Sequence, residues 1–293
     1  MPSDYRIRAT AAGGLLRGVA VLTTQSAESA RRAHQAQPVA AAAMGRLISS
    51  AAILGVDLKE GQSRLSVEAQ GGGPLGRVVA EIRAGGLLRA RVQHPEVDLP
   101  LRSDGKLAVG QAVGDGGFLT ILRQTMDGDW YQSQVSLKTG EIGEDVLHYL
   151  IQSEQVPSAV SVGVLVGTKG EVIGSGGVLV QALPGCPPAL ADETADRFSR
   201  LNQISRRLAD GDALQALLAD VLPEAIKWYS PEPLRWDCGC NRSSIVRALS
   251  TLPSQDLDDL IADGGAEVTC QYCCSAYRFT ANELDQMRTG DAR

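Results

Sequence analysis

Residues 238–240 read Cys-Gly-Cys and residues 270–273 read Cys-Gln-Tyr-Cys, and these two stretches decide the fold of the C-terminal part of the chain. They are separated by 29 residues. Cysteine pairs at i, i+2 and i, i+3 are typical of knuckles that gather four thiolates around one tetrahedral zinc ion. We therefore predict one zinc ion per chain in the reduced protein, and its ligands are these four residues: Cys238, Cys240, Cys270 and Cys273.

The segment between the two pairs is predicted to form a small helical body. Its apolar residues recur at helical spacing on two stripes: Ile245, Val246, Leu249 and Leu252, then Leu257, Leu260 and Ile261. A module of this size buries only about 60% of its unfolded surface, whereas structural zinc contributes roughly 10–16 kcal/mol of apparent binding energy in small finger peptides. We therefore expect the module to unfold when its metal is removed.

The chemistry of a four-thiolate site excludes some functions. Four sulfur ligands leave no open position for a substrate, so we expect neither a hydrolytic zinc nor another catalytic residue. Zinc-bound thiolates are deprotonated and can react with oxidants, and each pair places a second sulfur near enough to convert a sulfenic acid into a disulfide. The spacing alone leaves two interpretations open, an architectural zinc site and a redox switch.

The rest of the chain indicates where such a protein works. The first 14 residues carry charges and no apolar core, so we expect the protein to stay in the cytoplasm. Six cysteines in a reducing compartment favour metal binding or redox sensing over permanent disulfides. The most apolar stretch, residues 38–58, is mostly alanine and is interrupted by Arg46 and Asp57, so no membrane crossing is expected.

The charge is uneven along the chain. Residues 237–293 hold nine acidic and five basic residues, a net charge of −4, and the remaining 25 acidic and 23 basic residues give −2. An acidic module repels phosphates, so we do not expect it to bind nucleic acid.

Strands are predicted between residues 64 and 181, because apolar and polar residues alternate there. Residues 160–166 place four valines on one face, residues 167–170 form a turn, and residues 178–181 return as an antiparallel strand. Helices are predicted from Pro38 and over Glu144 to Gln152. This is an α+β pattern with a mixed or antiparallel sheet, and its lack of regular strand-helix alternation argues against a doubly wound nucleotide fold.

Beyond residue 184 the apolar residues recur at the spacing of a helix instead of alternating as in a strand. Residues 190–208 are predicted to share one stripe, and a second helix, capped by Asp212, follows over residues 214–222. Three prolines between residues 223 and 236 indicate a connecting segment. We therefore predict three parts: an α+β core domain, a helical linker region and a zinc-binding domain, which span residues 1–184, 185–236 and 237–293.

Motifs along almost the whole chain resemble one known family. The C-terminal motifs are Cys238-Gly239-Cys240, Arg247-Ala248-Leu249, residues 264–273 and Tyr277-Arg278-Phe279. Upstream, the similar segments are residues 42–46, 72–76, 153–161 and 176–185. In these motifs and their spacing the chain is similar to the 33 kDa chaperonin family, bacterial heat-shock chaperones that are regulated by redox state.

The resemblance implies a stress-response chaperone that works without ATP and is not an enzyme. Its reduced, zinc-loaded form is inactive. Oxidant and unfolding conditions together pair Cys238 with Cys240 and Cys270 with Cys273, release the zinc, and unfold first the zinc domain and then the linker. The resemblance also implies that the apolar surface exposed in this way binds unfolded client proteins and that the active form is a homodimer. It assigns client binding and dimerisation to the core domain, residues 1–184, and the redox switch to the zinc-binding domain, residues 237–293.

Two cysteines depart from the family pattern. Cys186 lies in a Pro-Gly segment and Cys274 directly follows the second pair. Cys274 could replace a ligand or divert a disulfide, so the assignment at the second pair stays open.

Two rival functions share parts of the pattern. Similar cysteine pairs occur in zinc ribbons that bind nucleic acid, but the acidic charge of the module counts against this alternative. A thiol oxidoreductase could use the pair at residues 270–273, but the strand and helix expected before such a motif are absent from the sequence.

Overall fold

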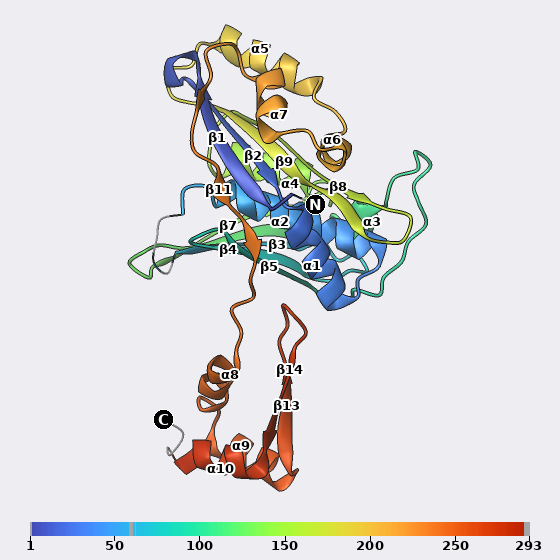
Figure 1. Ribbon diagram of the computed structural model, residues 1–293, viewed down its shortest axis with the longest axis vertical. Helices are drawn as coiled ribbons and strands as arrows, with labels where there is room; N and C mark the ends of the chain where they lie inside the picture. The colour runs from blue at the N-terminus through green and yellow to red at the C-terminus, as the bar shows by residue number, and fades with distance from the viewer. Residues whose placement is uncertain (1, 59–60, 62, 290–293) are drawn as a thin grey trace. The chain divides into compact units, whose positions relative to one another are not determined.

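The computed structural model describes residues 2–58, 61 and 63–289, and the chain forms two compact units, Met1–Asp237 and Cys238–Arg293 (Figure 1). Within the described residues, no helix has the length and apolar character that crossing a membrane requires. The two units are built from separate hydrophobic clusters.

The larger unit contains two six-stranded sheets. The first has the order β10-β1-β2-β9-β8, with β11 also paired to β1, and all of its pairs are antiparallel. Its strands are β1 (Tyr5–Ala11), β2 (Leu16–Leu22), β8 (Ser158–Val166), β9 (Val172–Ala182), β10 (Lys227–Trp228) and β11 (Glu232–Pro233). A short 3-10 helix, η1 (Ala12–Gly14), joins β1 to β2.

The second sheet has the order β12-β5-β4-β3-β6-β7, and only the β12–β5 pair is parallel. Its strands are β3 (Arg64–Gln70), β4 (Val78–Arg83), β5 (Leu87–Val92), β6 (Phe118–Gln124), β7 (Trp130–Ser136) and β12 (Arg235–Trp236). The observed architecture confirms the predicted α+β class.

The main core lies between the two sheets around α2 (Pro38–Leu54). Pro38 occupies the first turn, where its missing N–H costs no hydrogen bond, and small alanines let both sheets approach the helix. Gly45 allows the closest approach, because a Cβ there would lie 2.7 Å from a methyl carbon of Val164. The neighbouring helices are α1 (Thr24–His34), α3 (Val109–Val113) and α4 (Gly143–Gln152).

Helices α5 (Pro188–Ser199), α6 (Ile204–Asp210) and α7 (Leu214–Val221) cover the other face of the first sheet. The stripe predicted over residues 190–208 is divided between α5 and α6, because Gln203 adopts a left-handed conformation with φ of 51°. The predicted cap at Asp212 is wrong. The N-cap of α7 is Ala213, and the Asp212 carboxylate instead accepts a 2.6 Å hydrogen bond from Arg207.

The segment that joins these helices to the second unit is extended. Its residues 227–237, called the strap below, include β10, β11 and β12 and run along edges of both sheets. The linker residues 185–236 thus lie inside the compact body of the larger unit. The three-part domain division with its assigned roles stays a prediction.

The smaller unit contains helices α8 (Arg242–Leu249), α9 (Ser254–Ala262) and α10 (Ala281–Thr289) and a two-stranded hairpin of β13 (Gly265–Thr269) and β14 (Ala276–Thr280). Among the residues described there, the buried residues of the apolar core are Leu249, Leu257, Phe279 and Leu284. Leu249 and Leu257 belong to the two predicted stripes, and the other residues of these stripes pack against the core as half-buried residues. This core is small for an independent fold.

Candidate metal centre

The first cysteine pair lies just before α8. Gly239 has a φ of 68°, a left-handed conformation that glycine adopts without strain, and the chain turns sharply enough for the Cys240 N–H to donate to the Cys238 sulfur at 3.4 Å. Asn241 then caps α8: its side chain accepts the Ser244 N–H at 2.8 Å, and its own N–H donates to the Ser244 hydroxyl at 3.0 Å. The helix start therefore fixes the position of the first pair.

The second pair lies in the loop of the β13–β14 hairpin. The Cys270 N–H donates to the Ser275 carbonyl at 3.0 Å, and the Cys274 N–H donates to the Cys270 carbonyl at 2.9 Å. Cys274 adopts a left-handed conformation with φ of 57°, which completes the turn. These backbone bonds hold Cys270 and Cys273 on one side of the loop.

The structure brings the four cysteines predicted as ligands together. Their sulfurs all lie within 4.8 Å of one another, and the Cys240 sulfur is 3.1 Å from that of Cys238 and 3.3 Å from that of Cys273. All four residues are half-buried. Of the residues that the structure describes, neither Cys186 nor Cys274 belongs to this group.

The donor set fits zinc. Four thiolates bound tetrahedrally at about 2.3 Å from one ion lie about 3.8 Å apart, and the spacing of these sulfurs brackets that value. Soft sulfur donors without oxygen ligands also favour zinc over magnesium or calcium. That these four residues hold an ion stays a prediction, which the geometry supports.

The four thiols differ in their surroundings. Burial raises the pKa of Cys238, Cys240 and Cys270. Burial acts in the same direction at Cys273, but hydrogen bonds from the Ser275 side chain and backbone outweigh it and lower the pKa of Cys273 to about 6. The loop therefore stabilises a thiolate at this position.

Two polar neighbours of the sulfurs were missed by the cysteine spacing. The Tyr277 hydroxyl lies 3.1 Å from the Cys240 sulfur, and this hydrogen bond raises the pKa of Tyr277 to about 12, so the phenol stays protonated and donates to the sulfur. The Ser275 hydroxyl lies 3.3 Å from the Cys273 sulfur. Ser275 and Tyr277 lie within a few residues of the second pair, and their hydroxyl groups were the sequence feature that could have indicated these contacts.

Arg242 fastens α8 to the hairpin beside the cysteines. Its guanidinium lies 4.3 Å from the centre of the Phe279 ring, donates to the Arg278 carbonyl at 2.9 Å and pairs with Glu283 at 2.5 Å. The Glu283 carboxylate also accepts the Thr280 N–H at 2.9 Å, at the start of α10. One arginine thus ties the element after the first pair to the elements after the second.

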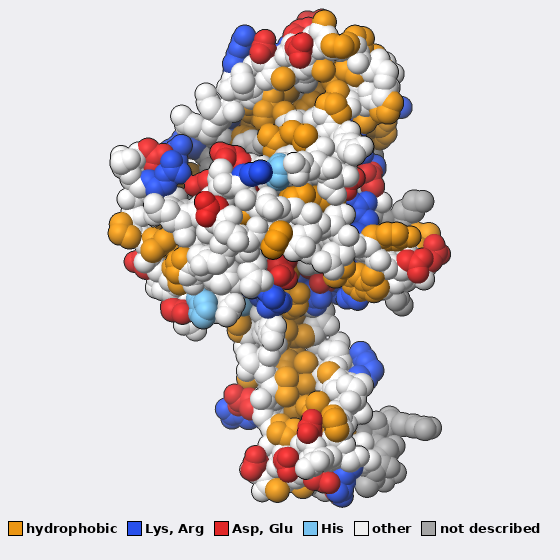
Figure 2. Space-filling model, turned by 180° about the vertical axis from the view of Figure 1, so that it is seen from behind, with side chains coloured by type: hydrophobic (Ala, Val, Ile, Leu, Met, Phe, Trp, Pro, Cys, Tyr) orange, Lys and Arg blue, Asp and Glu red, His pale blue; other side chains and the backbone are white. Residues whose placement is uncertain are grey.

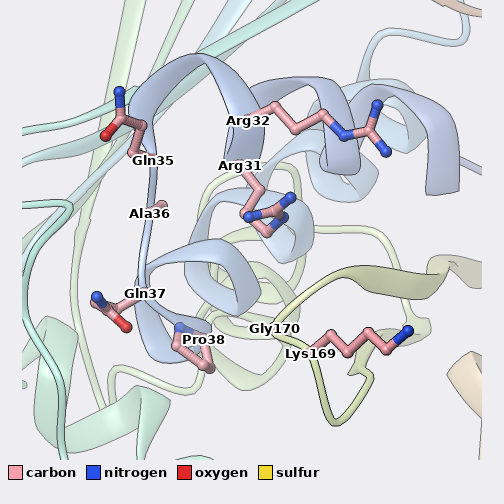
Figure 3. A pocket seen from close by; sticks show the side chains of 8 residues that line it. All are labelled: Arg31, Arg32, Gln35, Ala36, Gln37, Pro38, Lys169 and Gly170. Atoms are coloured by element: carbon pink, nitrogen blue, oxygen red, sulfur yellow. The ribbon is translucent and has the colours of Figure 1, made fainter.

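A pocket of about 490 Å³ lies elsewhere, between the α1–α2 turn and the β8–β9 turn (Figure 3). Arg31, Arg32 and Lys169 line it, but Glu28 pairs with Arg31 at 2.8 Å and with Arg32 at 2.7 Å. Because an internal carboxylate engages both arginines, we assign this pocket no ligand.

Comparison with known proteins points to one family. The family model described as "Hsp33 protein" matches residues 4–280. A 33 kDa chaperonin of Synechococcus sp. (strain JA-2-3B'a(2-13)) is 40% identical over 284 residues, covering 96% of this chain and 89% of that protein. The 33 kDa chaperonin of Bacillus subtilis (strain 168) is 35% identical over 291 residues, covering 99% of this chain and 100% of that protein.

The same family is found among solved structures. The crystal structure of a 33 kDa chaperonin (heat shock protein 33 homolog) from Thermotoga maritima superimposes with a TM-score of 0.88 at 29% identity and covers 99% of both chains. Sequence and fold agree along nearly the full length, and the chain belongs to the Hsp33 family.

Proposed function

We propose that this chain is a redox-regulated chaperone that holds unfolding proteins without ATP, and that its cysteine group is the switch. Membership of the Hsp33 family supports the chaperone function. The observation that carries the switch is the gathering of four cysteine sulfurs within 4.8 Å, in a unit whose apolar core is small. The same small core supports dependence of the fold on the metal.

Cys238, Cys240, Cys270 and Cys273 would hold a zinc ion, which when bound keeps them as thiolates and links the segment before α8 to the loop of the β13–β14 hairpin. The Tyr277 hydroxyl and the Ser275 hydroxyl orient two of the sulfurs by hydrogen bonding. Ordered sulfurs of this kind keep the unit folded in the reduced state.

Oxidation by hydrogen peroxide would convert pairs of cysteine sulfurs to disulfides in two steps. A thiolate attacks hydrogen peroxide to give a sulfenic acid and hydroxide, and a neighbouring thiol then displaces water from the sulfenic acid to form a disulfide. We propose the pairs Cys238–Cys240 and Cys270–Cys273. Because the Cys240 sulfur is similarly close to Cys238 and Cys273, the distances support either partner, and disulfide mapping of the oxidised protein tests the pairing.

The linker helices would supply the client-binding surface. Their leucine-rich layer covers apolar side chains of the first sheet. Hydrophobic side chains are also visible on the surface at the end of the larger unit where these helices lie (Figure 2). The buried residues of the helical layer are Ile204, Leu208, Leu214, Leu217, Leu218, Val221 and Leu222. Loss of order in residues 185–236 would expose both layers, and contiguous apolar area is what binds unfolded chains.

The remaining parts of the proposal follow the family. We propose that the active form is a homodimer, that it works in the cytoplasm and that it binds unfolded polypeptides without catalysing a reaction. A nucleic-acid-binding zinc ribbon is not favoured, because the cysteine module is acidic.

Light scattering of an aggregating client tests the proposal. The peroxide-treated, warmed protein is expected to suppress aggregation, whereas the reduced, zinc-loaded protein is not. Protein that is warmed without peroxide serves as the control for the effect of heat alone. Equal suppression by the reduced and the oxidised protein would refute the switch.

A further inference from the structure

The strap, residues 227–237, occupies an edge of each sheet in the larger unit. Its β10 pairs with Ala9 and Thr10 of β1, its β11 pairs with Tyr5 and Arg6, and its β12 then pairs with β5 of the second sheet. The orange trace in Figure 1 follows this course. One extended segment thus closes edges that would otherwise be open.

The strap binds both edges through its backbone. The N–H groups of Tyr229 and Leu234 donate to carbonyls of β1 and of the residue before it, each at 3.0 Å. The N–H groups of Arg235 and Asp237 donate to the carbonyls of Gly86 and Leu88 at 3.0 and 2.8 Å. Hydrogen bonds of this kind do not depend on the sequence of the bound segment.

Side chains of the strap add two kinds of contact. Leu234 is buried in the main core, and Trp236, two residues later, packs against the same core. Glu232 pairs with Arg6 at 2.7 Å and with Arg8 at 2.9 Å. The edges therefore accept an extended segment that carries two apolar side chains two residues apart and a carboxylate two residues before the first of them.

The strap is also the part of the larger unit that is directly joined to the smaller unit, which contains the proposed switch, because Asp237 is followed by Cys238. When residues 238–293 unfold, the strap loses its ordered anchor. Its release would leave unpaired N–H and C=O groups on both edges, which is a template for pairing with another extended chain.

We propose that in the reduced protein the strap occupies the site that later binds client. After its release, the edges of β1 and β5 bind an extended segment of an unfolded protein by strand addition. This inference rests on the proposed function and specifies its recognition mode. Recognition through the backbone would allow one surface to hold clients of unrelated sequence. The arginines released from Glu232 would favour client segments with acidic residues.

A peptide with the sequence of the strap tests the proposal on the full-length protein. The labelled peptide is expected to bind the oxidised, warmed chain and to displace reduced, carboxymethylated lactalbumin, a permanently unfolded client. The matched control is the same peptide N-methylated at the four donating amides, those of residues 229, 234, 235 and 237. Losing four hydrogen bonds is expected to weaken its binding at least about tenfold.

The outcomes separate the two proposals. Equal binding of the methylated peptide, or clients that stay bound in the presence of the unmodified peptide, would overturn strand addition and leave the chaperone function standing. An oxidised chain that suppresses no aggregation would overturn the proposed function, and the strand-addition proposal would fall with it.

Two neighbouring glycines offer a second test. Gly85 and Gly86 have similar φ values of 78° and 75°, but a Cβ at Gly86 would lie 2.2 Å from the Pro233 carbonyl, whereas a Cβ at Gly85 meets nothing within 4 Å. Gly86→Ala is expected to lower the affinity of the oxidised chain for the unfolded client several-fold relative to Gly85→Ala. Equal affinities in the two variants would contradict binding at this edge.

Discussion

At the scale of single residues, the phenol of Tyr277 links the hairpin to the cysteine group. It lies 3.1 Å from the Cys240 sulfur and stays protonated, because the hydrogen bond raises its pKa to about 12. A hydrogen bond from outside the donor set orients a ligand and favours metal binding. Tyr277 is therefore a positioning residue for the cysteine group.

Replacing Tyr277 with Phe removes this hydrogen bond and keeps the ring. We expect zinc affinity to fall about tenfold, the lower end of the range for such contacts, as measured by equilibrium competition with a chromogenic chelator. Tyr131→Phe, at a residue that is 61% exposed in the other unit, is the control. An unchanged affinity in the Tyr277 variant would show that the contact does not support the metal.

Cys274 contributes to the second pair through its backbone, because its N–H donates to the Cys270 carbonyl while its side chain is exposed. Cys274→Ser preserves that bond, so we expect it to keep one zinc per chain. Cys273→Ser removes a proposed ligand and is expected to lose the metal. Zinc analysis of the two proteins purified under reducing conditions checks this, and zinc loss in the Cys274 variant would make Cys274 a ligand.

The local parts of the site could be predicted and its long-range contacts could not. Within each cysteine pair, a spacing of two or three residues already restricts where both sulfurs can point. The contact of Tyr277 with Cys240 depends on the register of the hairpin, in which Tyr277 lies opposite Val268. No pattern within the sequence sets that register.

At the scale of elements, Glu28 fastens α1 to β9. Its carboxylate accepts the Val172 N–H at 2.9 Å and pairs with Arg31 and Arg32 on its own helix. Burial favours the neutral acid, but the hydrogen bonds from these three residues outweigh it and lower the pKa of Glu28 from 4.5 to about 2. The folded state thus stabilises the charged form.

The lowered pKa predicts a pH dependence. Stability from Glu28 is fully present above about pH 4.5 and is lost as the pH falls toward 2. At about 1.4 kcal/mol per pKa unit it amounts to about 3 kcal/mol at most. We expect the difference in unfolding free energy between the wild type and Glu28→Gln to shrink between pH 5 and pH 3 in denaturant titrations. A difference that is independent of pH would contradict this assignment.

Helices and strands whose apolar residues recur at a regular spacing could be predicted from the sequence. Strands that form only by pairing with residues far along the chain could not. Pro38 and the alanine-rich run after it indicated α2, and alternation indicated β3 and β5. The two-residue strands of the strap carry no period, because they exist only where they meet β1 and β5. The break at Gln203 was hidden by an apolar stripe that continues on both sides of it.

Helix α7 packs closely on the first sheet. Leu218 is fully buried, and a Cβ at Gly18 of β2 would lie 2.8 Å from one of its methyl carbons. Leu218→Ala is expected to cost about 2–5 kcal/mol and to loosen the linker. The oxidised variant should therefore suppress client aggregation at a lower temperature than the wild type. Leu101→Ala, at a residue that is 61% exposed, is the control, and identical activation temperatures in both variants would argue against the linker as the covering layer.

At the scale of the whole molecule, the two units differ in how much of their stability their own cores can supply. The larger unit buries apolar residues on both faces of its first sheet and on one face of its second. The smaller one has few fully buried apolar side chains among its described residues, and its strands form a single hairpin. An isolated two-stranded hairpin is at best marginally stable in water.

This difference predicts selective unfolding on removal of the metal. Chelation of zinc from the reduced chain is expected to abolish the hydrogen-exchange protection of β13 amides and to leave that of β9 amides unchanged, because β9 is paired on both sides, with β2 and β8, and packs on the main core. Restoring zinc should restore the protection of β13, which separates loss of metal from irreversible damage. If β13 stays protected in the metal-free reduced protein, the small core alone sustains the fold, and oxidation would have to act on the unit by some means other than metal release.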